Sequence, residues 1–343
     1  MNVWPKEELE HLTRCPVCSG DERQVLYANL TDMIFRCAPG SWTLWRCNGC
    51  GCAYLDPRPN AQSIARAYTR YYTHHRDEGR AKGVATLKAF IKRARMYAAH
   101  DYLNHQYGYK LRPALLGGCL LTALPSFARF AEISIRHLPI ATSHSCTLLD
   151  VGCGDGNFLL EAERLGYKAV GLEPDEMAVK NANRKGLVVK AGRLPASELP
   201  YNSFSHVTMS HVVEHLHDPC EALREVYMLM QPQGRLWLAT PNLNTIQHYK
   251  SWALAYHLDP PRHLVLFDSD ALRVTLQKAG FTSIQIVAPR PDETRIFQSM
   301  AGATNVFSPL QDRTVVCSAA NEEHTLDQQD KQGEELFAVA YKD

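Results

Sequence analysis

The sequence predicts an α/β fold, a seven-stranded sheet with helices on both faces. Three observations lead to it. From residue 147 onward, short apolar runs alternate with amphipathic stretches of helical length. Two of these stretches end at glycines, Gly166 and Gly186, as helices commonly do. The first apolar run leads into a turn that holds three glycines. Alternation at these lengths favours a parallel sheet wound on both faces.

The composition is typical of a globular protein in a reducing compartment. Of the 343 residues, 45% are hydrophobic and 21% charged, and 37 Lys and Arg balance 36 Asp and Glu. The chain has no excess of positive charge, so its composition gives no indication of a nucleic-acid partner. The first residues, MNVWPKEELE, lack the pattern of a secretion signal. The eleven cysteines therefore suggest a cytoplasmic protein, in which metal binding is a better explanation for them than disulfides.

Two segments precede the expected sheet. Residues 1–60 are expected to be irregular, rich in cysteine and aromatic residues. Residues 61–145 are predicted to form a helical lid or insertion, in which 61–112 carry eleven Lys and Arg against three acids. The uncharged run at 113–128 has 16 residues, fewer than the roughly 20 that a spanning helix needs. We expect that run to be buried or interfacial.

The sheet and its helices are expected within residues 146–343. Strands are predicted at 146–152, 168–174, 187–192, 204–212, 235–242, 282–290 and 335–343. Helices are predicted at 157–166, 177–186, 220–234 and 270–280, the third with a Pro-Gly stop. A polar, acidic stretch at 321–334 precedes the last strand.

The turn in T-L-L-D-V-G-C-G-D-G predicts a ligand site at the carboxyl end of the first strand. Gly152, Gly154 and Gly156 follow a G-x-G-x-G spacing, one residue shorter than the dinucleotide fingerprint. Asp150 would repel a pyrophosphate but attract an amine. Glu173, at the end of the second strand, can accept both hydroxyls of a ribose. A ligand with a ribose, an amine and a carboxylate but no phosphate is indicated, and S-adenosylmethionine has these groups.

Residues 146–343 resemble the class I S-adenosylmethionine-dependent methyltransferases, which have a Rossmann-like seven-stranded sheet. The resemblance lies in D-V-G-C-G-D-G, G-L-E-P, S-H-V-V-E-H-L-H-D-P and L-M-Q-P-Q-G-R-L-W-L-A-T-P-N. It implies that Asp150, Gly152, Gly154 and Gly156 hold the methionine part and that Glu173 holds the ribose. It places Gly192 and Arg193 near the adenine, although Arg193 could equally be a solvated loop residue. Ser210 and His211 would line the floor beneath the methyl group.

Two cysteine pairs, C-P-V-C and C-N-G-C-G, predict a metal site in the N-terminal segment. Cys15, Cys18, Cys47 and Cys50 supply four thiolates, which suits a closed structural zinc site. Cys52 could compete with Cys50, and redox-active or unliganded pairs are the alternative. With its two cysteine pairs, segment 1–60 is predicted to be a zinc ribbon. This ribbon, together with the motifs A-Y-L-D-P-R-P and L-D-P-P-R-H-L-V-L-F-D (258–268), resembles a bacterial subgroup of these methyltransferases associated with sugar and surface-polysaccharide biosynthesis.

Methyl transfer to a hydroxyl needs a base near neutral pH, and histidine suits that role. The candidates are His263, His215 and His211, with Glu214 as a partner or an alternative. His215 could instead be a half-buried structural histidine. Arg262 could bind a substrate anion or pair with a nearby acid, and residues 217–219 are expected to form a turn and helix cap.

The leading functional hypothesis is methylation of a hydroxyl or carbon of a sugar or glycan precursor. The alternatives are a quinone or other small-molecule O-methyltransferase and a nonenzymatic scaffold that retains the fold. A nicotinamide oxidoreductase is disfavoured by the glycine spacing. The basic, partly apolar residues 76–140 suggest contact with a membrane surface and a lipid-linked or nucleotide-linked sugar. A lid helix with a solvated basic face is the alternative for them.

Overall fold

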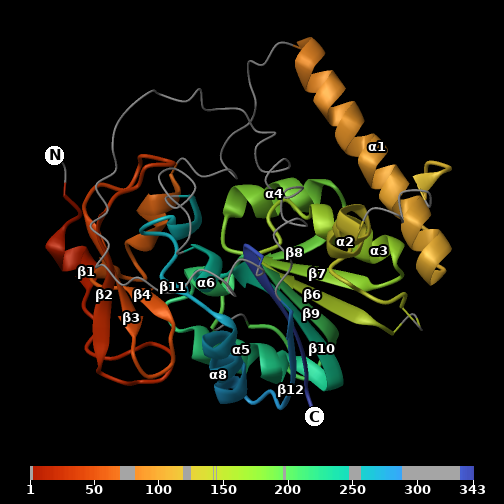
Figure 1. The fold of residues 1–343 in the computed structure, drawn as a ribbon. Helices are drawn as coiled ribbons and strands as arrows, with labels where there is room; N and C mark the ends of the chain where they lie inside the picture. The colour runs from red at the N-terminus through yellow and green to blue at the C-terminus, as the bar shows by residue number, and fades with distance from the viewer. Residues whose placement is uncertain are drawn as a thin grey trace.

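A seven-stranded sheet forms the centre of the molecule in the computed structural model, which describes residues 3–69, 82–118, 125–141, 143, 145–195, 198–246, 256–287 and 333–343. The strand order is β12-β13-β10-β9-β6-β7-β8 (Figure 1). The strands are β6 (Thr147–Val151), β7 (Lys168–Glu173), β8 (Val188–Ala191), β9 (Phe204–Ser210), β10 (Met230–Pro241), β12 (Ser283–Val287) and β13 (Glu335–Tyr341). All seven predicted strands are present, and the acidic stretch at 321–334 lies almost entirely outside the described residues.

The sheet is parallel except at one edge. Strands β6 to β10 pair in parallel, whereas β13 runs antiparallel to both β10 and β12. The predicted seven-stranded, mainly parallel sheet is therefore confirmed, and β13 is its antiparallel strand. Alternation of strands and helices indicates parallel pairing only where a crossover helix returns the chain to the same edge.

Helices cover both faces, as predicted. They are α3 (Asn157–Arg164), α4 (Glu176–Arg184), α5 (Pro219–Leu229) and α8 (Ser269–Ala279), with the short α6 (Leu243–Ile246) after β10. In Figure 1, α3 and α4 lie on one side of the sheet and α5 and α8 on the other. Asp218 caps α5 by accepting a hydrogen bond from the Glu221 amide at 2.8 Å, which confirms the predicted cap. Helix α5 ends before Pro232, earlier than predicted, because proline disfavours helix at the residue before it.

The N-terminal segment is not irregular, because it contains strands of its own. These are β1 (Leu9–Glu10), β2 (Arg23–Leu30), β3 (Trp42–Cys47), β4 (Ala53–Leu55) and β5 (Arg58–Pro59). A second sheet has the order β11-β4-β3-β2. Its edge strand β11 (Val265–Leu266) comes from much later in the chain than the other three strands. Short strands rich in polar and cysteine residues show little periodicity, which is why we missed them.

One hydrophobic core joins this small sheet to the large one. Trp42, Tyr54 and Leu55 belong to the same buried cluster as Met209 of β9 and Leu238 of β10. The Leu55 amide also donates to the Leu264 carbonyl at 3.0 Å. The N-terminal sheet is therefore part of the body of the molecule.

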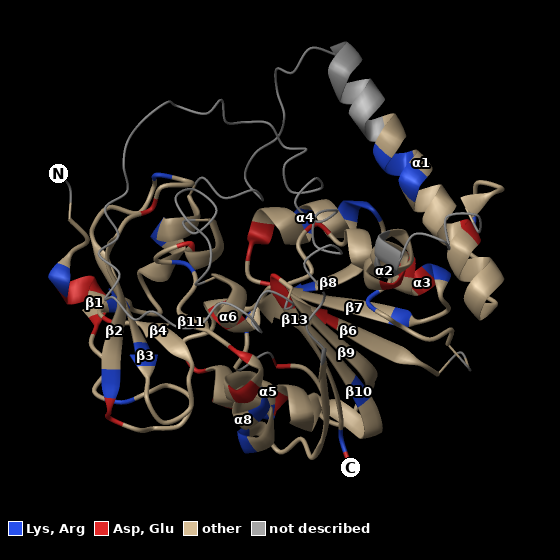
Figure 2. Cartoon of the chain, viewed as in Figure 1, with Lys and Arg blue, Asp and Glu red and all other residues tan. Residues whose placement is uncertain are grey.

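The helical insertion packs beside α3. Its described helices are α1 (Lys82–Tyr107) and α2 (Pro125–Ser134), preceded by a short 3-10 helix, η2 (Ile64–Tyr68). Buried residues of both, such as Leu103 and Phe130, share a second core with Leu159 of α3. Helix α1 projects beyond the sheet (Figure 1), and Lys and Arg lie in its middle part (Figure 2). Within the described residues, no helix combines the length and the apolar character that crossing a bilayer demands.

Candidate active site

The glycine turn lies between β6 and α3, where the strand ends, as predicted. All three glycines have positive φ, at 68°, 55° and 80°. A Cβ added to Gly152 would meet Val212 Cγ2 at 2.5 Å, and one added to Gly156 would meet Leu187 Cδ1 at 2.4 Å. At Gly154 nothing lies within 4 Å. Gly152 and Gly156 therefore allow close packing, whereas Gly154 leaves backbone open to a ligand.

Glu173 faces this turn from the end of β7. One carboxylate oxygen accepts the Gly154 amide at 2.8 Å and the other accepts the Asp175 amide at 3.0 Å. Burial raises the pKa of Glu173, and these two hydrogen bonds oppose the rise. Each oxygen keeps a second lone pair, so the carboxylate can still accept two hydroxyls of a ligand.

Asp150 is fully buried, and it has a protein partner that we did not expect. Its Oδ1 pairs with the Arg136 guanidinium and accepts the Thr208 hydroxyl at 2.9 Å. Among the described residues, Oδ2 accepts no hydrogen bond. Burial raises the pKa of Asp150, and Arg136 opposes the rise. An amine at this site would use Oδ2.

Arg136 follows α2 and reaches the sheet from the helical insertion. Its guanidinium lies 3.7 Å from the ring centroid of Phe158 and 5.6 Å from that of Trp237. Sequence reasoning did not identify Arg136, because no motif surrounds it and its contacts depend on how the insertion packs.

The other predicted cofactor residues lie at the same sheet edge. The Gly192 amide donates to the Glu173 carbonyl at 3.0 Å, next to the predicted ribose site. Arg193 is exposed and reaches the Ala61 carbonyl at 3.5 Å, so it contacts the N-terminal segment. Ser210 ends β9. His211 follows with a φ of 54°, and its side chain is 44% exposed.

His211 is held between two carboxylates. Its Nε2 lies 2.7 Å from Glu335 Oε1 and its Nδ1 lies 3.3 Å from Glu214 Oε1. Burial lowers the pKa of His211, but the two acids outweigh burial and raise the pKa above its ordinary value. A histidine that stays protonated is a poor general base, so His211 is better suited to holding Glu214 in its charged form.

Glu214, His215 and His263 lie together beside the ends of β9 and β10. Each offers one ligand or proton-accepting atom, and these atoms lie within 4.8 Å of one another. The two imidazole rings pack edge to face with centroids 4.8 Å apart. Burial, together with the nearby His263, lowers the pKa of His215 to about 4. The ring of His215 is therefore neutral at pH 7. The structure thus brings three of the four predicted candidates into one cluster, without His211.

Tyr68 is a second residue that the sequence did not reveal. It ends η2 in the N-terminal half, and its hydroxyl lies 3.0 Å from His215 Nδ1. The two residues are 147 positions apart in the chain, so only the folded structure brings them together.

Arg262 pairs with acids instead of facing an open site. Its fully buried guanidinium contacts Asp259 at 2.6 Å and Asp32 of the N-terminal segment at 2.6 Å. It also donates to the Ala67 carbonyl at 2.8 Å. Of the two roles considered for Arg262, the structure supports the structural one.

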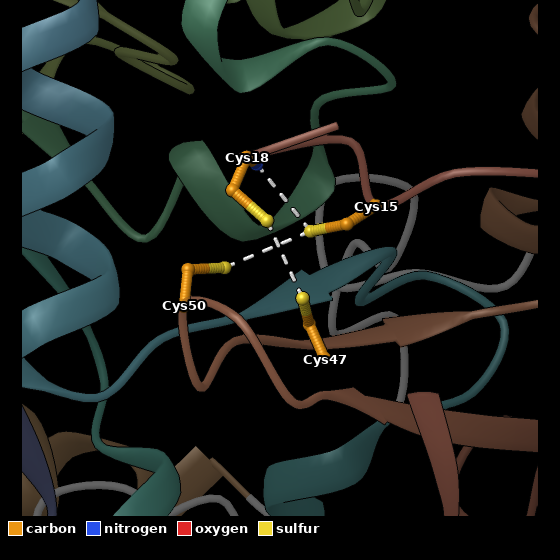
Figure 3. Close-up of side chains that lie close together, drawn as sticks. All are labelled: Cys15, Cys18, Cys47 and Cys50. Atoms are coloured by element: carbon orange, nitrogen blue, oxygen red, sulfur yellow. Dashed lines mark hydrogen bonds between the residues drawn. The ribbon is translucent and has the colours of Figure 1, made fainter. Parts of the chain in front are cut away.

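The four predicted metal-binding cysteines converge (Figure 3), and their Sγ atoms lie within 4.8 Å of one another. Cys15 and Cys50 are 3.7 Å apart, and Cys18 and Cys47 are 3.4 Å apart. Four sulfurs around a tetrahedral zinc ion lie about 3.8 Å apart. Cys52 Sγ lies 3.4 Å from Cys15 Sγ, so it remains an alternative to Cys50 as a ligand.

The strand order and the helices on both faces together define a Rossmann-like α/β domain. A sequence profile described as a methyltransferase domain matches residues 72–286, more than half of the chain. The chain therefore belongs to the methyltransferase domain family.

Curated relatives match a shorter stretch. A ubiquinone biosynthesis O-methyltransferase of Caulobacter vibrioides is 33% identical over 124 residues, 34% of this chain and 48% of the relative. A probable S-adenosylmethionine-dependent methyltransferase of Mycolicibacterium smegmatis is 26% identical over 144 residues, 40% of this chain and 54% of the relative. The matched region spans about half the length of these relatives.

Solved structures resemble the chain at low identity. An S-adenosylmethionine-dependent methyltransferase from Mesorhizobium loti is 16% identical, with 62% of this chain and 98% of that chain covered and a TM-score of 0.45. A phosphoethanolamine N-methyltransferase from Haemonchus contortus, in complex with S-adenosyl-L-methionine, is 14% identical. The match covers 93% of this chain and 68% of the Haemonchus contortus chain, with a TM-score of 0.46.

Proposed function

We propose that the protein is an S-adenosylmethionine-dependent methyltransferase that methylates a hydroxyl of a small acceptor. The observation that carries the proposal is the pairing of Glu173 with the open turn at Gly154. It places a buried carboxylate with free lone pairs beside a stretch of backbone that a ligand can approach. Membership of the methyltransferase domain family agrees with it.

The residues present fit this cofactor, which supplies a methyl group on a positively charged sulfur. Glu173 would accept the ribose hydroxyls, and Gly154 would leave room for the ligand. Oδ2 of Asp150 would accept the amine. Arg136 offers a guanidinium near the same end of the sheet, where a carboxylate can pair with it.

The acceptor hydroxyl must lose its proton for transfer, and the cluster of Glu214, His215 and His263 suits this step. The Nδ1 atom of His215 lies 3.0 Å from the Arg262 carbonyl, and that of His263 lies 2.8 Å from the His257 carbonyl. A carbonyl only accepts, so both Nδ1 atoms carry hydrogen and both Nε2 atoms keep a lone pair. When the methyl group of the cofactor and the acceptor oxygen are held in line, this positioning lowers much of the activation barrier to methyl transfer.

For the acceptor, we propose a sugar or glycan-precursor hydroxyl, as the ribbon and the loop at 258–268 suggest by resemblance. The second candidate is a phenolic hydroxyl of a quinone precursor, which the name of several curated relatives favours. Both acceptors carry a hydroxyl, so the same cluster would serve either one.

A labelled-methyl assay tests both acceptors. The protein is incubated with methyl-labelled S-adenosylmethionine and either nucleotide-linked and lipid-linked sugars or hydroxylated quinone precursors. Label in one panel identifies the acceptor class, and at a cofactor concentration below saturation it should fall strongly in Glu173→Gln. If label enters neither panel while the protein binds S-adenosylhomocysteine, the proposed acceptors are wrong. If the protein binds no S-adenosylhomocysteine, the proposed activity is wrong.

We propose that Cys15, Cys18, Cys47 and Cys50 bind a structural zinc ion. Backbone amides point at the sulfurs, with Val17 N at 3.4 Å from Cys15 Sγ and Gly20 N at 3.4 Å from Cys18 Sγ. Such hydrogen bonds support thiolate ligands. Four protein ligands leave no open position, which suits a structural ion and not a catalytic one.

We also propose that α1 touches a membrane surface on the cytoplasmic side. Phe90 and Ile91 are 68% and 50% exposed, and Lys92 and Arg93 beside them are also exposed. Apolar and basic side chains together suit an anionic lipid surface. Arg95 lies 4.8 Å from the ring centroid of Phe130, so it packs within the protein.

Liposome sedimentation tests the membrane contact. Lys92→Gln with Arg93→Gln should reduce binding to anionic vesicles roughly thirtyfold, since each basic residue near the surface contributes about 1 kcal/mol. Lys180→Gln with Arg184→Gln, on α4, is the matched control. Equal binding by both double variants and the wild type would rule the contact out.

A further inference from the structure

We propose that Glu214, His215 and His263 form a second metal site, for a divalent transition-metal ion such as zinc, separate from the four cysteines. The three ligand atoms lie within 4.8 Å of one another. Ligand atoms around a tetrahedral zinc ion lie about 3.4 Å apart, so small side-chain rotations would close the group on an ion. Two histidines and one carboxylate are a ligand set that zinc uses where a further position stays open.

The hydrogen bonds of both histidines prepare them as ligands. The Nδ1 of His215 lies 3.0 Å from the Arg262 carbonyl and 3.0 Å from the Tyr68 hydroxyl, and that of His263 lies 2.8 Å from the His257 carbonyl. Because a carbonyl only accepts, each Nδ1 is assigned the hydrogen. Metal-binding histidines usually donate their other ring N–H to a carbonyl or carboxylate, which fixes the tautomer and the ring orientation. With the hydrogen on Nδ1, the Nε2 atom of each ring keeps the lone pair that an ion would use.

Glu214 is prepared in the same way. Its side chain is fully buried, and Oε2 accepts the Thr240 hydroxyl at 3.0 Å. Its Oε1 accepts no hydrogen bond from a described residue, although His211 Nδ1 lies 3.3 Å away. A buried carboxylate with one oxygen oriented by a hydroxyl suits a metal ligand, and an ion would replace His211 as the partner of Oε1.

The cluster lies next to the glycine turn. Glu214 and His215 belong to the 3-10 helix η5 (Val213–His215), which directly follows Val212. The Val212 side chain in turn fills the space beside Gly152. An ion at the cluster would therefore lie at the sheet edge where we place the cofactor. Its role in the reaction rests on the proposed function: a hydroxyl bound to the ion loses its proton to solvent more easily than a free one.

Cobalt(II) provides the test, because its absorption distinguishes the two sites. The protein, with its cysteine site filled by zinc, is titrated with cobalt. We expect one equivalent to bind with visible d–d bands and without the near-ultraviolet charge transfer that thiolate ligands cause. Cys18→Ser should keep these bands.

Variants identify the ligands. His263→Ala and Glu214→Gln should each weaken cobalt binding at least tenfold. Thr240→Val, which removes only the hydroxyl on Glu214, should weaken it by about tenfold or more. His105→Ala, an exposed histidine on α1, is the matched control and should leave binding unchanged.

S-adenosylhomocysteine binding, measured by calorimetry on each variant, separates this proposal from the proposed function. Retained nucleoside binding with lost cobalt binding in His263→Ala supports the metal site in a folded protein. If wild-type protein takes up no cobalt beyond the thiolate site, or if His263→Ala binds it as well as wild type, the metal site is wrong and the cluster is a proton-accepting group only. If cobalt binds but S-adenosylhomocysteine does not, the metal site stands and the methyltransferase proposal fails.

Discussion

Glu173 is the residue on which cofactor binding depends most. Glu173→Gln keeps the size of the side chain but removes the charge and replaces one acceptor oxygen with a donor. Hydrogen bonds to a charged group contribute about 1.5–3 kcal/mol, so we expect S-adenosylhomocysteine to bind roughly 10–100-fold more weakly by calorimetry. Glu176→Gln, 78% exposed on α4, is the control and should bind normally. An affinity within twofold of wild type for Glu173→Gln would contradict the ribose assignment.

Two glycines of one turn should respond differently to alanine. Gly154 has open space around it, so Gly154→Ala should weaken S-adenosylhomocysteine binding at least tenfold and destabilise the fold by about 1 kcal/mol, from its positive φ. In Gly156→Ala the new methyl group meets Leu187 at 2.4 Å, so the loss of folding stability should be larger. Calorimetry and chemical denaturation measure the two effects. Unchanged S-adenosylhomocysteine binding in Gly154→Ala would show that Gly154 does not face the ligand.

At the scale of single residues, the sequence predicted the candidate site residues that belong to a sequence motif. Asp150, Glu173 and the three glycines occur at fixed distances from the ends of strands, so a linear pattern locates them. Arg136 and Tyr68 have no such pattern. They reach the site because the insertion and the N-terminal segment pack against the sheet, and such long-range contacts leave no local signal.

The loop after β10 connects the two sheets at the scale of elements. Its strand β11 pairs with β4, and Arg262 beside it is buried between Asp259 and Asp32. Removing one partner from a buried ion pair is destabilising, because the remaining charge stays desolvated.

Asp32→Asn tests this connection. Arg262 keeps Asp259, so we expect a loss of about 2 kcal/mol in the free energy of unfolding, measured by urea denaturation. Asp21→Asn, exposed in the same segment, should change it by less than about 0.5 kcal/mol. A negligible change for Asp32→Asn would show that the ion pair does not hold the N-terminal sheet in place.

The elements were predictable to different degrees. Strands and helices between 146 and 287 show clear periodicity and glycine or proline stops, and the structure confirms them. The antiparallel direction of β13 could not be predicted, because a strand has the same pattern in either direction. The strands at 9–59 were missed because most are short. Many of their side chains serve metal binding or contacts with the large sheet, so the strands lack a regular alternation of polar and apolar residues.

The whole molecule should behave as one cooperative unit. The core cluster that contains Trp42 and Tyr54 also contains Met209 and Leu238 of the large sheet, so loosening the ribbon exposes part of the main core. The sequence suggested three successive segments, at 1–60, 61–145 and 146–343. It could not show that the first shares a core with the last, because apolar patterns do not indicate which faces meet.

Loss of the cysteine-bound metal should therefore lower the stability of the entire protein. We expect Cys18→Ser to reduce the thermal midpoint by more than about 5 °C in a single transition, because structural zinc contributes folding free energy directly. Cys146→Ser, a half-buried cysteine outside the cluster, is the control. Metal analysis should show one equivalent less in Cys18→Ser. An unchanged midpoint and metal content would contradict a structural zinc site.

Calorimetric titration of the wild-type protein with S-adenosylhomocysteine tests the central claim most directly. The account predicts one saturable site with micromolar affinity, and no measurable heat with NADH at the same concentrations. No binding of S-adenosylhomocysteine at millimolar concentration, or preferential binding of NADH, would contradict it.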